Sequence, residues 1–169
     1  TGNVDLVYKN LYYAISWANT IKAEIEAKAD NFDEDFVKYV TGQIGFVRAL
    51  CYIRLTSLWG DVPLVDKIYT PEESKLPRSP FSEIMEKLEH IRQQNATNLE
   101  VTPYDSREGI ATKQAAIGMK VRAYLYAEDY ENTIKSALEL MELEKQNPSE
   151  IGFLDNYKDI FSNSNEDNK

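Results

Sequence analysis

The sequence of 169 residues is poor in the residue types that build covalent or metal-based sites. It contains one cysteine, Cys51, and one histidine, His90. A single cysteine excludes an internal disulfide framework and a cysteine-based zinc site, and a single histidine excludes any site that needs two imidazoles within the chain. There are 7 glycines, and none stands in a phosphate-binding pattern such as G-x-G-x-x-G. We therefore expect neither a metal ion nor another cofactor.

Basic residues are also few: 19, against 28 acidic residues, for a net charge of -9 at pH 7. This balance argues against a nucleic-acid partner, which would require clustered lysine and arginine, and against adsorption to an anionic membrane surface. No apolar run reaches the roughly 18 residues that a membrane-spanning helix needs. The sequence begins at Thr1 without a recognisable signal peptide, so a targeting segment could lie upstream.

Apolar residues recur at helical spacing along most of the chain. The spacing predicts helices over residues 4–28, 33–59 and about 80–95, and two more that start after Thr112 and Asp129. Residues 61–69 should be extended, because a glycine ends the second helix and a proline follows soon after. The expected core stripes are Val7, Leu11, Ala14, Ala18, Ile21 and Ile25 in the first helix, Phe36, Val40, Ile44, Val47, Cys51 and Leu55 in the second, and Ile134, Ala137, Leu138 and Met141 in the last.

These helices predict an all-α fold of antiparallel helix hairpins, stacked as a tetratricopeptide-like α–α superhelix. Residues 112–145 have about the length and layout of one such repeat. The match is degenerate, because Val121 and Thr133 stand where small residues are usual. We expect residues 1–161 to form this helical domain and residues 162–169 to be a polar, frayed tail.

The residues offer little that points to catalysis. No pair of carboxylates is singled out, His90 lies off the apolar stripe of its predicted helix, and Cys51 lies on one. We therefore expect no catalytic residue and no enzyme. Two aromatic residues in predicted loops, Tyr69 and Tyr104, are candidate ligand contacts, because an aromatic ring can stack on a sugar or on a partner. The alternative is that both rings clamp the helical scaffold.

Five motifs occur in order along nearly the whole chain: Y-x-x-I-x-x-A-N at residues 12–19, GQIGFVRALCYIRLTSLWGDVPLV at 42–65, LPRSP at 76–80, GIATKQAA with RAYLY between 109 and 126, and Y-x-x-I-F at 157–161. Each is weak alone. Together they resemble the RagB/SusD (SusD-like) family of nutrient-uptake lipoproteins. Three positions depart from the family pattern, because Gln43 and Gly45 replace an acidic and a basic residue and Ile110 replaces an arginine.

Seven residues of these motifs should be architectural and not catalytic: Arg48, Trp59, Gly60, Asp61, Pro63, Arg78 and Thr112. The family's chains are much longer. Neither their lipid-bearing N-terminal cysteine nor their irregular C-terminal half has a counterpart in this sequence. We therefore expect this chain to be the helical scaffold of a larger protein, which would contact the membrane only through that lipid anchor.

The resemblance implies a cell-surface glycan-binding protein on the extracellular face of the Bacteroidetes outer membrane. It would work in polysaccharide uptake with a SusC-like TonB-dependent transporter and break no bond. The first alternative is a free-standing tetratricopeptide-type adaptor that binds other proteins, and a more remote one is a hydrolase that uses acidic residues. We expect the chain alone to bind glycan weakly or not at all, because few loop aromatics remain.

Overall fold

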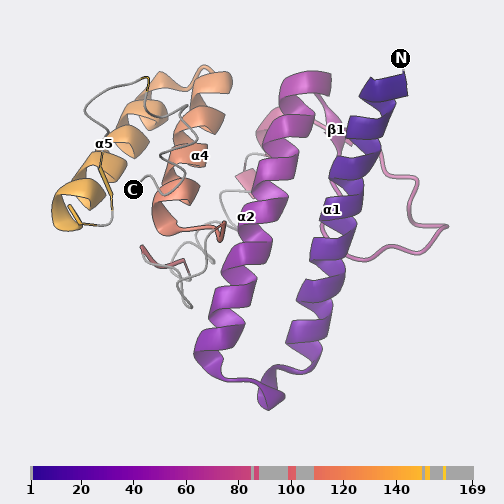
Figure 1. Ribbon diagram of the computed structural model, residues 1–169. Coiled ribbons are helices and arrows are strands. Elements are labelled where there is room, and N and C mark those ends of the chain that lie inside the picture. The colour runs from indigo at the N-terminus through magenta and orange to yellow at the C-terminus, as the bar shows by residue number, and fades with distance from the viewer. Residues whose placement is uncertain are drawn as a thin grey trace. The chain divides into compact units, whose positions relative to one another are not determined.

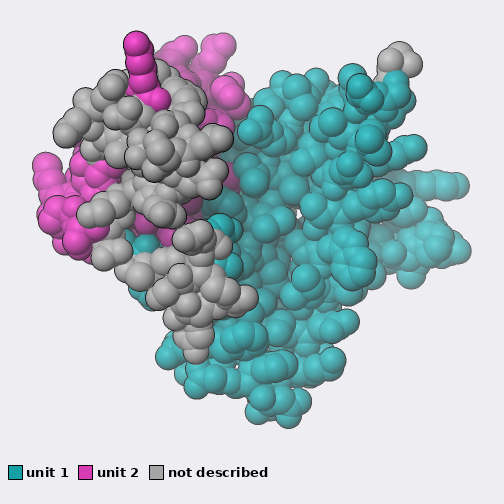
Figure 2. All heavy atoms as spheres, in the orientation of Figure 1, with its two compact units in different colours: residues 1–111 teal, residues 112–169 magenta. Residues whose placement is uncertain are grey.

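The structure is a computed structural model, and it describes residues 2–84, 86–87, 99–101, 109–149, 151–152 and 158. Over these residues helices dominate, and the paired strands are two residues long. The predicted all-α class is therefore confirmed. The chain divides into two compact units, residues 1–111 and 112–169, which Figure 2 shows in separate colours.

Unit 1 is built on a long antiparallel helix hairpin, in which α1 (Gly2–Ala27) and α2 (Glu34–Trp59) lie side by side (Figure 1). A short 3-10 turn, η1 (Ala29–Asn31), joins them. Asp33 caps α2, because its carboxylate accepts a hydrogen bond from the Asp35 N–H at 2.9 Å. Aspartate is among the most favourable residues at this position, so the predicted helix start is well placed.

The chain leaves α2 at Gly60 and passes through two short strands. β1 (Val62–Pro63) pairs antiparallel with β2 (Arg78–Ser79). Ser79 is the last residue of β2. Helical bonding begins at Pro80, whose carbonyl accepts from the Ile84 N–H at 3.1 Å.

The core of unit 1 lies between α1, α2 and the chain that follows them. Its fully buried members are Ile15, Cys51, Tyr52, Leu55, Val62 and Ile84. Cys51 is thus a small buried hydrophobic residue, and burial raises the pKa of its thiol. A buried thiol in apolar surroundings is unreactive, as the sequence pattern predicted.

Unit 2 contains α4 (Lys113–Tyr126) and α5 (Tyr130–Gln146), which pack against each other. Thr112 caps α4, because its hydroxyl accepts from the backbone of the first turn, and Asp129 caps α5 in the same way. The buried residues of these two helices are Ile117, Ala123, Ser136 and Leu143.

Each of the three expected core stripes includes residues that the structure leaves exposed. In α1, Val7 and Ile21 are exposed, and the buried side carries Ile15, Ala18 and Asn19. A polar residue is buried here because its amide is hydrogen-bonded to the loop after α2.

In α2, Val47 is exposed and Arg48 is buried in its place. In α5, the predicted residues Ile134, Leu138 and Met141 are exposed, whereas Ser136 is buried. The α5 prediction was wrong because the buried side of the helix carries Ser136 and Leu143, and neither belongs to the predicted stripe.

Candidate functional site

The loop after α2 is held by two polar side chains of α1. The Tyr12 hydroxyl donates a hydrogen bond to the Pro63 carbonyl at 2.7 Å. The Asn19 amide donates to the carbonyls of Val65 and Lys67, at 3.0 and 3.2 Å. These contacts join residues about 50 positions apart, since Tyr12 and Pro63 are separated by 51. They fix the course of the loop beside α1.

Two side chains of α2 hold the same loop. The Tyr52 hydroxyl accepts from the Val65 N–H at 2.7 Å and donates to the Val65 carbonyl at 3.2 Å. Arg48 is 3% exposed and donates through Nη2 to the Asp66 carbonyl across 3.5 Å, which makes a weak bond, while its Nε has no partner. Burial raises the pKa of Tyr52 to about 12 and lowers the pKa of Arg48. Tyr52 and Arg48 are therefore both buried, and both bond to the backbone of the loop.

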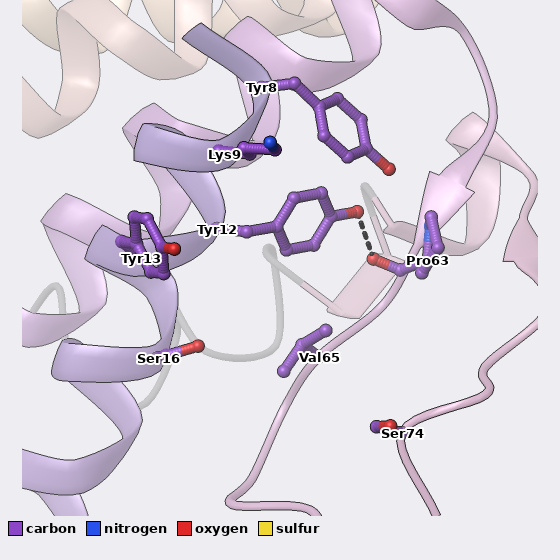
Figure 3. A pocket seen from close by; sticks show the side chains of 8 residues that line it. All are labelled: Tyr8, Lys9, Tyr12, Tyr13, Ser16, Pro63, Val65 and Ser74. Carbon is purple, nitrogen blue, oxygen red and sulfur yellow. Dashed lines mark hydrogen bonds between the residues drawn. The ribbon is translucent and has the colours of Figure 1, made fainter. Parts of the chain in front are cut away.

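An open groove of about 380 Å³ lies between α1 and this loop (Figure 3). Its lining residues are Tyr8, Lys9, Tyr12, Tyr13, Ser16, Pro63, Val65 and Ser74. The Tyr12 ring extends from α1 toward Pro63, and Val65 and Ser74 stand on the loop side. The volume is near the lower end of the range for small-molecule sites.

Aromatic packing supports one wall of the groove. The Tyr8 ring lies 4.9 Å from the Tyr12 ring and meets the Trp59 ring edge-on at 5.1 Å, as measured between centroids. Burial raises the pKa of Tyr12, so its phenol stays protonated and remains a donor. Trp59, predicted to be architectural, therefore contacts a wall of the groove through Tyr8.

The other predicted architectural residues lie around the end of α2 or in unit 2. The Asp61 carboxylate accepts from the Phe81 N–H at 3.3 Å, and Arg78 donates to the Asp61 carbonyl at 3.2 Å. The structure thus brings Asp61, Pro63 and Arg78 together beside β1 and β2. Thr112 belongs to unit 2, where it caps the start of α4.

Of the two aromatic residues predicted as ligand contacts, Tyr69 lies among the described residues. The Tyr69 hydroxyl donates to Asp66 Oδ1 at 2.7 Å, which raises the pKa of Tyr69 to about 12. The Lys67 ammonium lies 4.9 Å from the centroid of the Tyr69 ring. One ring face of Tyr69 is therefore already occupied by a cation. Tyr104 and His90 lie outside the described residues.

Sequence reasoning missed most of the groove. It gave no ligand-binding role to Tyr8, Lys9, Tyr12, Tyr13 or Ser16. The available signal was three tyrosines within six consecutive residues of one predicted helix. Such a cluster exceeds what one core stripe can bury, since residues 12 and 13 point in directions about 100° apart.

Two kinds of feature do not occur in the part of the chain that the structure describes. No three His, Cys, Asp or Glu side chains there are grouped so that they could hold a metal ion. Among the helices of the same residues, none has the length and apolarity to cross a membrane.

Replacing Gly60 by alanine should lower the free energy of unfolding by about 1–3 kcal/mol. Gly60 has φ 69° and ψ -127°, a conformation that only glycine adopts readily, and its N–H bonds to the Thr56 carbonyl at 2.9 Å. Gly118→Ala is the matched control, because Gly118 lies within α4 with open space around it. It should be neutral or stabilising. Thermal unfolding followed by circular dichroism compares the two, and equal effects would contradict the strain at Gly60.

Comparison with known proteins identifies relatives over most of the chain. Residues 2–125 match a SusD-like family model described as "Starch-binding associating with outer membrane". The SusD-like protein P25 of Formosa agariphila is 26% identical over 167 residues, which cover 98% of this chain and 31% of that protein.

Solved structures show the same likeness. A SusD-like protein from Bacteroides fragilis superposes with a TM-score of 0.81 at 27% identity, over 98% of this chain and 32% of that chain. Surface glycan-binding protein A from Bacteroides uniformis has a TM-score of 0.82 over 95% of this chain and 35% of its own. Its 19% identity supports likeness of fold alone. The chain thus spans about a third of the length of these relatives.

Proposed function

This chain belongs to the SusD-like family, and on that basis we propose that it is the helical part of a cell-surface protein that binds a glycan or another nutrient. The whole protein passes the bound molecule to a SusC-like TonB-dependent transporter and breaks no bond in it. It acts on the extracellular face of the outer membrane and is attached there by a lipid anchor.

The observation that carries this proposal is the family match over residues 2–125, because the family's description names both starch binding and the outer membrane. The name of the Bacteroides uniformis neighbour also refers to glycan binding at a surface. The aromatic groove beside α1 supports the same function, since aromatic rings with polar groups around them suit sugars.

Within this function we assign an architectural role to the residues of the sequence motifs. Arg48 donates a hydrogen bond to a loop carbonyl, and the Asp61 carboxylate accepts one from a backbone N–H. We therefore assign neither side chain a contact with the ligand. Tyr69 and Tyr104 remain our candidate glycan contacts in the whole protein. Tyr69 would offer the ring face that Lys67 leaves open.

Affinity electrophoresis of the protein expressed from its complete reading frame tests glycan binding. Gels containing starch, laminarin, xylan or pectin are run with serum albumin as the unretarded control. We expect at least one glycan to slow the protein, with no release of reducing sugar. Release of sugar would mean catalysis, and unchanged mobility in every gel would refute glycan binding.

Fractionation of the native cells tests the location and the partner. We expect the protein in solubilised outer membranes, in a complex from which mass spectrometry identifies a TonB-dependent transporter. Recovery in the cytoplasm with other protein partners would instead favour a tetratricopeptide-type adaptor.

A further inference from the structure

We propose that the groove beside α1 binds one pyranose ring of a glycan, so that the helical part supplies a binding subsite and not a scaffold alone. This inference rests on the glycan-binding function proposed above. Tyr13 supplies the aromatic surface of the subsite. Lys9, Ser16 and Ser74 supply the hydrogen-bonding groups around it.

Tyr13 carries the ring that a sugar can reach. Its side chain is 64% exposed, and it stands with Ser16 on the helix side of the groove (Figure 3). The neighbouring Tyr12 ring is half-buried, and its hydroxyl is committed to the Pro63 carbonyl. The face of an aromatic ring is electron-rich, so it attracts the slightly positive C–H groups of a pyranose face. The Tyr12 ring is therefore held in place as part of the groove wall, and the Tyr13 ring is the one that stacks on the sugar.

The polar groups of the groove include both donors and acceptors. The Ser74 hydroxyl donates to the Pro71 carbonyl at 2.7 Å, so it offers its lone pairs to a ligand. The Lys9 ammonium offers donors only, and the Ser16 hydroxyl can serve in either way. Each sugar hydroxyl can donate and accept, which matches this mixture.

The groove is also formed in advance of binding. Its loop wall is tied to the helices through Tyr12, Asn19 and Tyr52. Little ordering of the protein is then needed when a ligand binds. The volume of about 380 Å³ and the open side leave room for one ring, with the rest of the glycan outside. A single open contact of this kind gives millimolar dissociation constants, which agrees with the weak binding expected of the chain alone.

Affinity electrophoresis in the same four polysaccharide gels tests the subsite, with the 169-residue chain and the whole protein run in parallel. We expect a gel that slows the whole protein to slow the chain as well. Tyr13→Ala in the chain should weaken this binding about fivefold or more, and Tyr13→Phe, which keeps the ring, should bind like the parent. Tyr126→Ala, which removes another exposed tyrosine, in unit 2, should have no effect.

The outcomes separate the subsite from the function. If the whole protein is slowed but the chain is not, or if Tyr13→Ala binds like the parent, the subsite is wrong and the proposed function stands. If no gel slows the whole protein, the proposed function fails and the subsite with it. Far-ultraviolet circular dichroism checks that Tyr13→Ala is folded. The proposal is supported if Tyr13→Phe keeps the binding and Tyr13→Ala loses it.

Discussion

Replacing Tyr52 by alanine is expected to lower the free energy of unfolding of unit 1 by about 4 kcal/mol. Tyr52 is 0% exposed, and its hydroxyl holds both backbone groups of Val65. The substitution leaves a cavity where the ring packs and an N–H without its partner. Both tryptophans, Trp17 and Trp59, lie in unit 1. Their fluorescence in a urea titration therefore reports on the unfolding of this unit.

Two further variants separate the ring of Tyr52 from its hydroxyl. Tyr52→Phe keeps the packing but leaves the Val65 N–H unpaired, so we expect a loss of about 1–3 kcal/mol. Tyr126→Ala removes an exposed ring of unit 2 and should change the stability by less than about 0.5 kcal/mol. A Tyr52→Ala protein as stable as Tyr52→Phe would show that the ring is not a central part of the core.

Unit 1 is also expected to lose stability between about pH 10 and pH 12. Burial raises the pKa of Tyr52 from 10.0 to about 12, and burial raises the pKa of Tyr12 as well. Above pH 10 these phenols ionise in the unfolded chain while they stay protonated in the folded one, so rising pH favours unfolding. The stabilisation is fully present below pH 10. Tyr52 alone should lose about 2–3 kcal/mol by about pH 12.

Urea titrations at a series of alkaline pH values measure this loss, and tyrosinate absorbance reports the ionisation. Tyr52→Phe is the control, because it removes one of the two shifted groups and should make the pH dependence shallower. The same dependence in the parent chain and in Tyr52→Phe would mean that Tyr52 ionises as easily in the folded state as in the unfolded one.

The helices themselves could be predicted from the sequence, because their start and stop signals are local. Asp33 and Thr112 cap helices through bonds to backbone groups within three residues. Gly60 ends α2 in a conformation that glycine alone adopts readily. Such signals depend on neighbours in the sequence, so no knowledge of the tertiary structure was needed.

The side of each helix that is buried was harder to predict, because it depends on partners far away in the sequence. Asn19 and Arg48 are polar and were left out of the expected stripes. Both are buried, since the loop after α2 offers them carbonyl acceptors. Val7 matches the apolar pattern and is nevertheless exposed. Hydrophobicity alone carries no information on where those acceptors lie.

The candidate site could be predicted only in outline. A loop aromatic was expected near residue 69, and Tyr69 does lie in the loop after α2. The groove itself was missed because its walls come from residues 8–16 and 63–74, which meet only in the folded chain. The sequence does not distinguish Tyr13 from the other helical aromatic residues, because its exposure and its neighbours in the groove depend on the fold.

Side chains of α1 and α2 hold the loop after α2 mainly through hydrogen bonds to its main chain. Tyr12, Asn19 and Arg48 all bond to carbonyl groups, which every amino acid carries. Exchange of an exposed side chain of this loop, such as that of Ile68, therefore leaves these bonds in place. In evolutionary terms, point mutations can change the exposed side chains of this loop at little cost in folding.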